Sequence, residues 1–485
     1  MVNWAFAHPV AGLILVLLLT SPGASQSSQP LRLHPDNPHY FLWRGRTTVL
    51  VTSGEHYGAL LNLDFDYRRY FAELSRHGLN HTRLFSGVYR EVPSSFGITD
   101  NTLAPRPGRY LCPWARSDRP GYYDGGNKFD LTRYDPAYFR RLHDLMSEAS
   151  RHGIVVEFNL FCPLYHENLW KASPMNAANN VNGIGDCPRT EVYTLKHPEL
   201  LRVQLDFVRK VVRELAPYDN LYYEVCNEPY FGGVTQEWQE KVIETIVETE
   251  RSLPTRHLIS LNIANGRKKV ENVHPNVSIL NFHYCVPPDT VELNYALNRV
   301  IGENETGFRG RDDILYRTEG WDFILAGGAL YSNLDYSFTP KHPDGSFREY
   351  RSPGGGSPEL RAQLGVLKRF IESFDLVHMR PCREIIRELS PSLTAYALGN
   401  PGREYAIYMH VPLPWKPKRL ADHLRTDIEV NLALAIPDGR YVAEWISPIT
   451  GEPLAKQTVR SNNGILHLRS PRFDNDVALA VRAAK

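Results

Sequence analysis

Short apolar runs alternate with longer amphipathic segments along most of this chain, and this alternation constrains the fold more than any other feature. It can be followed from two similar stretches, Ser75-Arg76-His77-Gly78 and Ser150-Arg151-His152-Gly153. In both, basic residues fill the last turn of a helix, and glycine takes the left-handed position that follows it. An apolar run begins directly after each glycine, which predicts a buried strand.

The segment before the second of these stretches predicts a complete helix. Asp135 can cap its N-terminus, and Pro136 suits its first turn. Apolar residues at helical spacing form a single stripe, made of Phe139, Leu142, Leu145, Met146 and Ala149.

Eight strand–helix units follow when the pattern is continued along the chain. We expect strands near 48–53, 79–85, 154–160, 220–226, 257–262, 278–283, 299–303 and 329–334. We expect helices near 65–77, 136–152, 198–216, 236–252, 267–273, 289–298, 312–326 and 358–374. Eight alternations predict a (β/α)₈ barrel, whose active residues lie at the carboxyl ends of the strands. The alternative is an open doubly wound sheet, but no glycine-rich phosphate-binding motif follows the first strand.

The pattern changes after about residue 385. Short strands separated by turn residues predict an antiparallel β-sandwich. We expect its strands near 394–398, 404–409, 427–432, 441–446, 464–468 and 477–481. The predicted organisation is therefore a barrel domain at 30–380 and a β-sandwich domain at 385–485.

The N-terminus resembles an export signal. An uninterrupted apolar run from Val10 to Leu19 is too short to span a bilayer, and small residues suitable for cleavage follow it. No lysine or arginine precedes the run, which is atypical of such signals. We expect a signal peptide at 1–25, a secreted or periplasmic mature protein, and no membrane association once the signal is removed.

Charge and cysteine content exclude some classes of function. The 55 Lys and Arg residues balance 54 Asp and Glu residues, which gives no support to nucleic-acid binding. The six cysteines show no spacing typical of a metal site. One disulfide among Cys112, Cys162 and Cys187 is expected for an exported protein. The sequence carries no signal for an oligomeric state.

Two strand ends carry carboxylates. The apolar run 221–226 stops at Asn227-Glu228-Pro229, where proline prevents the strand from continuing. The run 299–302 ends at Glu303-Asn304-Glu305-Thr306-Gly307. Either glutamate alone is better explained as a solvated loop charge or as a partner in a structural ion pair. Two carboxylates that converge on one cleft from different strands are what acid/base and nucleophilic cleavage of a glycosidic bond requires.

These motifs resemble those of the clan A glycoside hydrolases, the superfamily that includes the family 5 cellulases and mannanases. Tyr223-Glu224-Val225-Cys226-Asn227-Glu228-Pro229 is similar to their fourth-strand signature, and the run 300–307 to their seventh-strand nucleophile motif. Arg83 resembles their second-strand arginine, and His283-Tyr284 their sixth-strand histidine and tyrosine. The likeness covers roughly residues 45–380.

The resemblance implies a role for each matching residue. Glu228 would be the acid/base, and Asn227 would bind a sugar hydroxyl. Between the two candidate nucleophiles we favour Glu305, because it lies nearer the barrel mouth; Glu303 would point to the same face of the strand and support it. Arg83 would hold the nucleophile ionised, or pair with Glu157 on the next strand.

Further substrate contacts are expected around these carboxylates. Tyr284 would donate to the nucleophile, and His283 and His56 are candidate substrate-binding residues. A partly buried acid that faces a second carboxylate should have a raised pKa. Long loops after the second and third strands supply aromatic residues for subsite walls or lids, namely Tyr110, Trp114, Tyr122, Tyr123, Tyr165, His166 and Trp170.

The chain also departs from family 5. The eighth strand lacks the usual tryptophan, and His283 and Tyr284 are adjacent rather than separated by a residue. The expected function is a retaining glycoside hydrolase without a cofactor, acting on an oligo- or polysaccharide. The alternatives are a sugar-binding scaffold on an inactive barrel and a metal-dependent barrel hydrolase.

Overall fold

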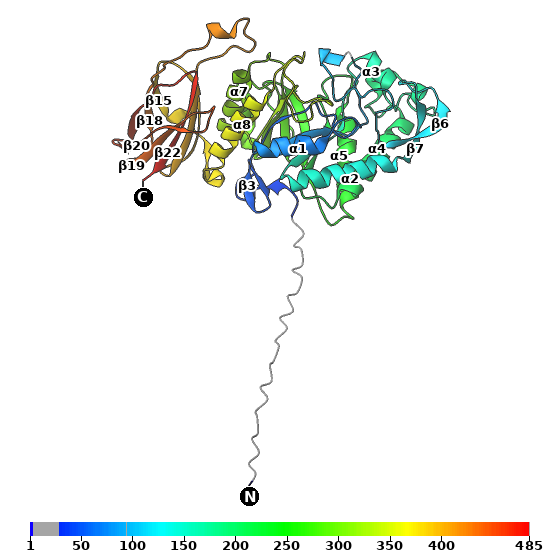
Figure 1. The fold of residues 1–485 in the computed structure, drawn as a ribbon, viewed down its shortest axis with the longest axis horizontal. Coiled ribbons are helices and arrows are strands. Elements are labelled where there is room, and N and C mark those ends of the chain that lie inside the picture. The colour runs from blue at the N-terminus through cyan, green and yellow to red at the C-terminus, as the bar shows by residue number, and fades with distance from the viewer. Residues whose placement is uncertain (3–28, 94, 485) are drawn as a thin grey trace.

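The computed structural model describes residues 1–2, 29–93 and 95–484, which form two parts that lie side by side (Figure 1). A barrel of parallel strands and helices comes first, and antiparallel sheets follow towards the C-terminus. The predicted signal sequence and its cleavage site fall on residues outside the described part. Within the described residues, no helix is long and apolar enough to cross a membrane.

Eight parallel strands form the barrel, paired in the order β4-β13-β12-β11-β10-β9-β8-β5. Their bounds are β4 (Leu50–Gly54), β5 (His81–Phe85), β8 (Val155–Phe161), β9 (Leu221–Cys226), β10 (Ile259–Asn265), β11 (Ile279–His283), β12 (Val300–Thr306) and β13 (Leu330–Leu334). Asn80 joins the two ends of this order. Its side chain accepts from Val51 N at 3.0 Å and donates to Val49 O at 2.9 Å. The predicted (β/α)₈ barrel is confirmed.

Helices follow seven of the eight strands. They are α1 (Tyr67–Arg76), α2 (Pro136–Arg151), α4 (Pro198–Leu215), α5 (Gln236–Glu250), α6 (Asp289–Asn294), α7 (Asp313–Leu325) and α8 (Pro358–Ile371), while the short α3 (Glu167–Ala172) lies in the loop after β8. The local signals act as the sequence predicted. Asp135 caps α2 by accepting from Ala137 N at 2.8 Å, and Gly78 and Gly153 have φ values of 75° and 68°.

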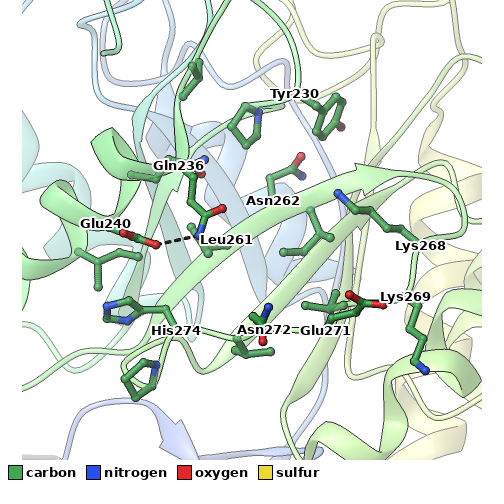
Figure 2. A pocket seen from close by; sticks show the side chains of 18 residues that line it. Tyr230, Gln236, Glu240, Leu261, Asn262, Lys268, Lys269, Glu271, Asn272 and His274 are labelled. Carbon is green, nitrogen blue, oxygen red and sulfur yellow. Dashed lines mark hydrogen bonds between the residues drawn. The ribbon is translucent and has the colours of Figure 1, made fainter. Parts of the chain in front are cut away.

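The helix predicted near 267–273 is not formed. This stretch is irregular, because it holds only Val270 and Val273 as apolar anchors and soon reaches Pro275, too little for a stable helix. The outer face of β10 is therefore left half-covered at Leu261 and Ile263. A groove of about 890 Å³ lies over it, with Tyr230 near one end and His274 near the other (Figure 2).

Two small sheets of the barrel region were not predicted. Residues before the first barrel strand form β1 (Arg32–Leu33), β2 (Phe41–Trp43) and β3 (Arg46–Thr48). The long loop after β5 contains a hairpin of β6 (Trp114–Pro120) and β7 (Asn127–Tyr134). The hairpin anchors this loop over the mouth side of the barrel because Tyr122 beside it donates to Ala172 O at 2.7 Å.

Two antiparallel sheets enclose a second core near the C-terminus. The six-stranded sheet has the order β14-β16-β17-β22-β19-β20, and the three-stranded sheet has the order β15-β18-β21. Their bounds are β14 (Arg380–Pro381), β15 (Ile386–Ser390), β16 (Thr394–Asn400), β17 (Glu404–His410), β18 (Asn431–Ala435), β19 (Gly439–Ile446), β20 (Pro453–Ser461), β21 (Ile465–Arg469) and β22 (Asp476–Ala483). The sequence missed β14, β15 and β20, which are edge strands without a continuous apolar run.

Helix α7 packs between the barrel and the six-stranded sheet, and nearly all of its residues are buried (Figure 1). Arg317 of α7 donates from Nε to Asp476 of β22 at 2.8 Å, and both side chains are buried. Trp321 stacks on Tyr408 of β17 with ring centroids 4.9 Å apart. The two parts therefore share a buried, partly charged interface.

All six cysteines are free, so the expected disulfide among Cys112, Cys162 and Cys187 is wrong in this structure. Cys112 directs its sulfur to Trp114 O at 3.5 Å within its own loop. Cys162 lies at the end of β8 beside Asn227, with a sulfur–nitrogen distance of 3.6 Å. Cys112 and Cys162 therefore lie in different local environments.

Candidate active site

Glu228 is the second residue after the end of β9, at the mouth of the barrel. Its backbone has a φ of 34°, a left-handed conformation that is uncommon for a residue with a side chain. Tyr165 donates to Glu228 Oε2 at 2.6 Å, whereas the hydroxyl of Tyr230 donates to Asn265 Oδ1 and lies 3.4 Å from Oε1 of Glu228. The proton of Tyr165 is directed at Glu228 because its oxygen accepts from Asn227 Nδ2 at 2.7 Å.

Glu305 lies near the end of β12 and receives three hydrogen bonds. Tyr57 donates to Oε2 at 2.9 Å, and Arg83 Nη1 donates to the same oxygen at 3.0 Å. Tyr284 donates to Oε1 at 2.6 Å. A carboxylate that accepts from a guanidinium and two phenols is held in one orientation.

Glu228 and Glu305 face each other across the mouth with His283 beside both. Single ligand atoms of these three residues all lie within 4.8 Å of one another. His283 Nδ1 is 3.2 Å from Glu228 Oε1 and 3.6 Å from Glu305 Oε1. The two carboxylates that the sequence placed on different strands are thus brought together.

Glu303 points away from this pair. Its Oε1 accepts from Cys285 N at 2.6 Å, and it lies beside Glu319 of α7, outside the barrel. Burial, and then the charge of Glu319, raise its pKa well above its ordinary value. Glu303 therefore stays neutral and does not line the cavity at the mouth.

The expectation that Glu303 and Glu305 share one face of the strand is wrong because β12 contains a bulge. Phe282 pairs with Glu303, but the next residue of β11, His283, pairs with Glu305. Asn304 is the extra residue, and its side chain points into the barrel, donating to Glu157 at 2.6 Å. A bulge interrupts the alternation of side chains along a strand. Glu303 and Glu305 are two residues apart, but because the bulge lies between them they point to opposite faces of β12.

Arg83 lies beneath the site and bonds three glutamates. Besides Glu305, its guanidinium donates to Glu157 Oε1 at 2.9 Å and to Glu224 Oε1. Its Nη2 also donates to Asn227 Oδ1 at 2.8 Å. Both predicted roles of Arg83, support of the nucleophile and pairing with Glu157, are therefore present in the same side chain.

The glutamates around Arg83 have different pKa values. Burial opposes ionisation of Glu157, but the charge of Arg83 and the contacts from His81 and Tyr222 together outweigh it and lower the pKa to about 2. Burial dominates at Glu224 and raises its pKa to about 8. With Glu224 neutral near pH 7, the positive charge of Arg83 is shared by Glu157 and Glu305.

The expected rise in the pKa of Glu228 is not found. Burial acts in that direction, but hydrogen bonding and charge from His283, together with the hydrogen bond from Tyr165, outweigh it. The pKa of Glu228 therefore lies below its ordinary value. Burial and the second carboxylate could be expected from the sequence, but the hydrogen-bond donors that lower the pKa of Glu228 come from other parts of the chain.

A small cavity of about 50 Å³ joins these side chains. Its lining includes five of the predicted site residues, namely His56, Asn227, Glu228, Tyr284 and Glu305. Ten described non-glycine residues have a positive φ. Six of them are Arg44 and five Asn or Asp residues. The other four all line this cavity, namely Tyr57, Phe96, Glu228 and Tyr284. Strained backbone held at one place marks it as a functional site.

Most aromatic residues of the long loops do not reach this cavity. Tyr165 lines it, whereas Tyr110, Trp114, Tyr122 and Trp170 are buried away from it, with Trp114 packed against Phe207 of α4. The lining residues that were not among the predicted site residues include Tyr57, Glu91 and Phe96. The only signal for Tyr57 was its position next to His56.

The C-terminal part also approaches the site. The ring of Trp415 lies edge-on to that of Tyr284, with centroids 6.2 Å apart. Arg309 fixes this loop by donating to Trp415 O at 2.9 Å and to Glu319 at 3.0 Å. A residue beyond the barrel therefore contacts a donor to Glu305.

The same trio of Glu228, His283 and Glu305 has a donor set that could hold a divalent cation. However, each carboxylate already accepts tyrosine hydroxyls, at 2.6 Å from Tyr165 and 2.6 Å from Tyr284. A cation would have to displace or reorient these protons. The geometry therefore favours two hydrogen-bonded carboxylates over a metal centre.

Comparison with known proteins supports the fold. No protein-family model matches the sequence, and no curated protein matches it. A solved structure from Bacteroides vulgatus ATCC 8482, provisionally named a glycoside hydrolase, is 14% identical with a TM-score of 0.66, over 95% of this chain and 84% of that chain. A family 5 glycoside hydrolase from the same organism is 12% identical with a TM-score of 0.59, over 94% and 93%. A further structure named glycoside hydrolase is 11% identical with a TM-score of 0.60, over 94% and 97%. At such identities the likeness establishes a shared fold.

Proposed function

We propose that this protein is a retaining glycoside hydrolase that cleaves an oligo- or polysaccharide by double displacement. The observation that carries the proposal is the approach of Glu228 and Glu305 to within 4.8 Å. Retaining enzymes place their two carboxyl groups about 5–5.5 Å apart, whereas inverting enzymes need about 6.5–9.5 Å to admit a water molecule. The fold shared with solved glycoside hydrolases supports the same conclusion.

In the first step Glu305 attacks the anomeric carbon while Glu228 gives its proton to the leaving oxygen. The bond from carbon to the leaving group breaks as the bond to Glu305 Oε forms. Glu305 is suited to attack because Arg83 and two tyrosines hold its carboxylate in place. Glu228 must be protonated at the start of this step. Because its pKa lies below the ordinary value, the protonated fraction is substantial only at acidic pH, where we expect this step to be faster.

In the second step Glu228, now ionised, takes a proton from water as that water attacks the anomeric carbon. The ester bond to Glu305 breaks, the sugar leaves, and both carboxyl groups return to their first state. The bonds from His283 and Tyr165 stabilise the ionised form of Glu228, which is the form that this step requires.

A 2-deoxy-2-fluoro glycoside with a good leaving group tests the assignment of the nucleophile. We expect the trapped sugar to be recovered on the peptide that contains Glu305. Glu228→Gln should lose most activity on alkyl glycosides, lose less on activated aryl glycosides, and recover part of it with azide. A protein that binds oligosaccharide without turnover or labelling would instead be the sugar-binding scaffold.

We also propose that the protein is exported. The apolar run from Val10 to Leu19 and the small residues after it support this proposal. N-terminal sequencing of the protein secreted by its own host should give a mature terminus near residue 26. A mature protein that retains Met1 would contradict export by this signal.

A further inference from the structure

A third carboxyl group lines the catalytic cavity and has no part in double displacement. Glu91, from the loop after β5, is buried and shares this cavity with Glu228 and Glu305. Its Oε1 accepts from Tyr89 at 3.2 Å, and its Oε2 accepts from Asn101 Nδ2 at 2.5 Å. These two donors fix the plane of the carboxyl group, and each of its oxygens keeps a free lone pair.

His56 stands beside Glu91 on the same wall. Its Nε2 is 3.7 Å from Glu91 Oε1, and its Nδ1 is buried without a partner among the described residues. The ring packs edge-on to Tyr57, with centroids 5.6 Å apart, and Tyr57 donates to Glu305. An unsatisfied buried nitrogen costs stability unless a ligand or water completes it.

Among the described residues, no lysine or arginine lines this cavity. Arg83 is fully buried beneath it, and all three of its nitrogens already donate to protein groups. Burial lowers the pKa of His56 to about 4, so its ring is neutral near pH 7.

We propose that Glu91 and His56 bind the hydroxyl groups of an uncharged sugar ring whose anomeric carbon lies at Glu305, and that the cavity rejects uronic acids. The proposal rests on the function proposed above and names its substrate class. A carboxyl group can accept from two neighbouring hydroxyls at once, and the free imidazole nitrogen can complete a third. Burial raises the pKa of Glu91 to about 7, so this group carries negative charge at and above neutral pH. The carboxylate of a uronic acid would meet Glu91 and Glu305 with no lysine or arginine of the lining to pair with it.

The first test is a panel of aryl glycosides of neutral hexoses and pentoses beside glucuronide and galacturonide. We expect the wild-type enzyme to hydrolyse at least one neutral glycoside, with kcat/KM for both uronides at least about 100-fold lower. A uronide that is hydrolysed as fast as the best neutral glycoside would overturn the inference. If no glycoside is hydrolysed, the proposed function itself fails, and this inference fails with it.

The second test compares Glu91→Gln with the wild type on monodeoxy forms of the best aryl glycoside. Because burial raises the pKa of Glu91 to about 7, the comparison is made above that pH, where Glu91 is ionised. Loss of a hydrogen bond to a carboxylate should then lower kcat/KM by about 10- to 100-fold on the parent substrate. One deoxy position should carry a penalty in the wild type that disappears in the variant, because the missing partner is the same.

Asp100→Asn is the matched control, since Asp100 belongs to the same loop but pairs with Lys341 at the surface, 3.0 Å away. It should keep wild-type kinetics, and Glu91→Gln should keep the wild-type melting temperature. Equal penalties at every deoxy position in Glu91→Gln and wild type would overturn the role of Glu91. His56→Ala gives the same readout independently if Glu91→Gln does not fold.

Discussion

Replacing Tyr165 with phenylalanine removes one hydroxyl group and keeps the ring, so it isolates the effect of that hydroxyl on Glu228. The hydroxyl donates to Glu228 Oε2 at 2.6 Å and is one of the contacts that outweigh burial in setting the pKa. A hydrogen bond to a charged group contributes about 1.5–3 kcal/mol, and about 1.36 kcal/mol corresponds to one pKa unit. We therefore expect the pKa of Glu228 to rise by about one to two units.

The sign of the effect on activity follows from the role of Glu228. A general acid acts only when protonated, so kcat/KM falls as the pH rises through its pKa. Tyr165→Phe raises this pKa, so the falling limb of the profile should move to higher pH by about one to two units. At neutral pH the variant should therefore retain a larger fraction of its own maximal kcat/KM than the wild type does.

The assay is the pH profile of kcat/KM on a substrate with a poor leaving group, such as an alkyl glycoside. A dinitrophenyl glycoside needs little protonation and should lack this limb. Tyr230→Phe is the control, because Tyr230 is 38% exposed and its contact with Glu228 is 3.4 Å long. Its limb should move much less. The reasoning is refuted if Tyr165→Phe leaves the limb in place or moves it to lower pH.

Three further perturbations separate the parts of the account. Glu303→Gln should keep turnover within about threefold of the wild type, because burial and Glu319 already favour the neutral form of this group, whereas Glu305→Gln should be inactive on the same substrate. Inactivity of Glu303→Gln would mean that Glu303 takes part in the chemistry. Asp476→Ala removes one partner of a buried ion pair between barrel and sandwich, so urea unfolding should show a loss of about 3–5 kcal/mol, and an unchanged midpoint would mean that the interface does not depend on this pair. Dialysis against a chelator should leave kcat/KM unchanged, and loss of activity that zinc or calcium restores would assign the trio of Glu228, His283 and Glu305 to a metal.

Much of the fold could be predicted from the sequence because its signals are local. Helix ends such as Ser75-Arg76-His77-Gly78 and caps such as Asp135 depend on a few neighbouring residues. The strands of the barrel are buried on both faces and read as apolar runs. The edge strands β15 and β20 have exposed residues and no such run, so they could not be found in the same way.

The site was only partly predictable, because its details depend on contacts between distant segments. The position of Glu228 and Glu305 at strand ends follows from the motifs around them. The bulge that turns Glu303 outwards depends on how β12 pairs with β11, and no residue in the sequence of β12 predicts it. The low pKa of Glu228 depends on Tyr165 and His283, which come from two other parts of the chain. Glu91 belongs to a long loop whose path the sequence pattern does not define.

The stereochemistry of the first-formed product tests the central claim most directly. One carboxylate oxygen of Glu228 and one of Glu305 lie within 4.8 Å of each other, closer than the separation of about 6.5–9.5 Å between carboxyl groups that an inverting enzyme needs. Proton NMR of the anomeric signal, recorded within the first turnovers and before mutarotation, distinguishes the two outcomes. The account predicts that the product keeps the anomeric configuration of the substrate. A first-formed product of inverted configuration would contradict it.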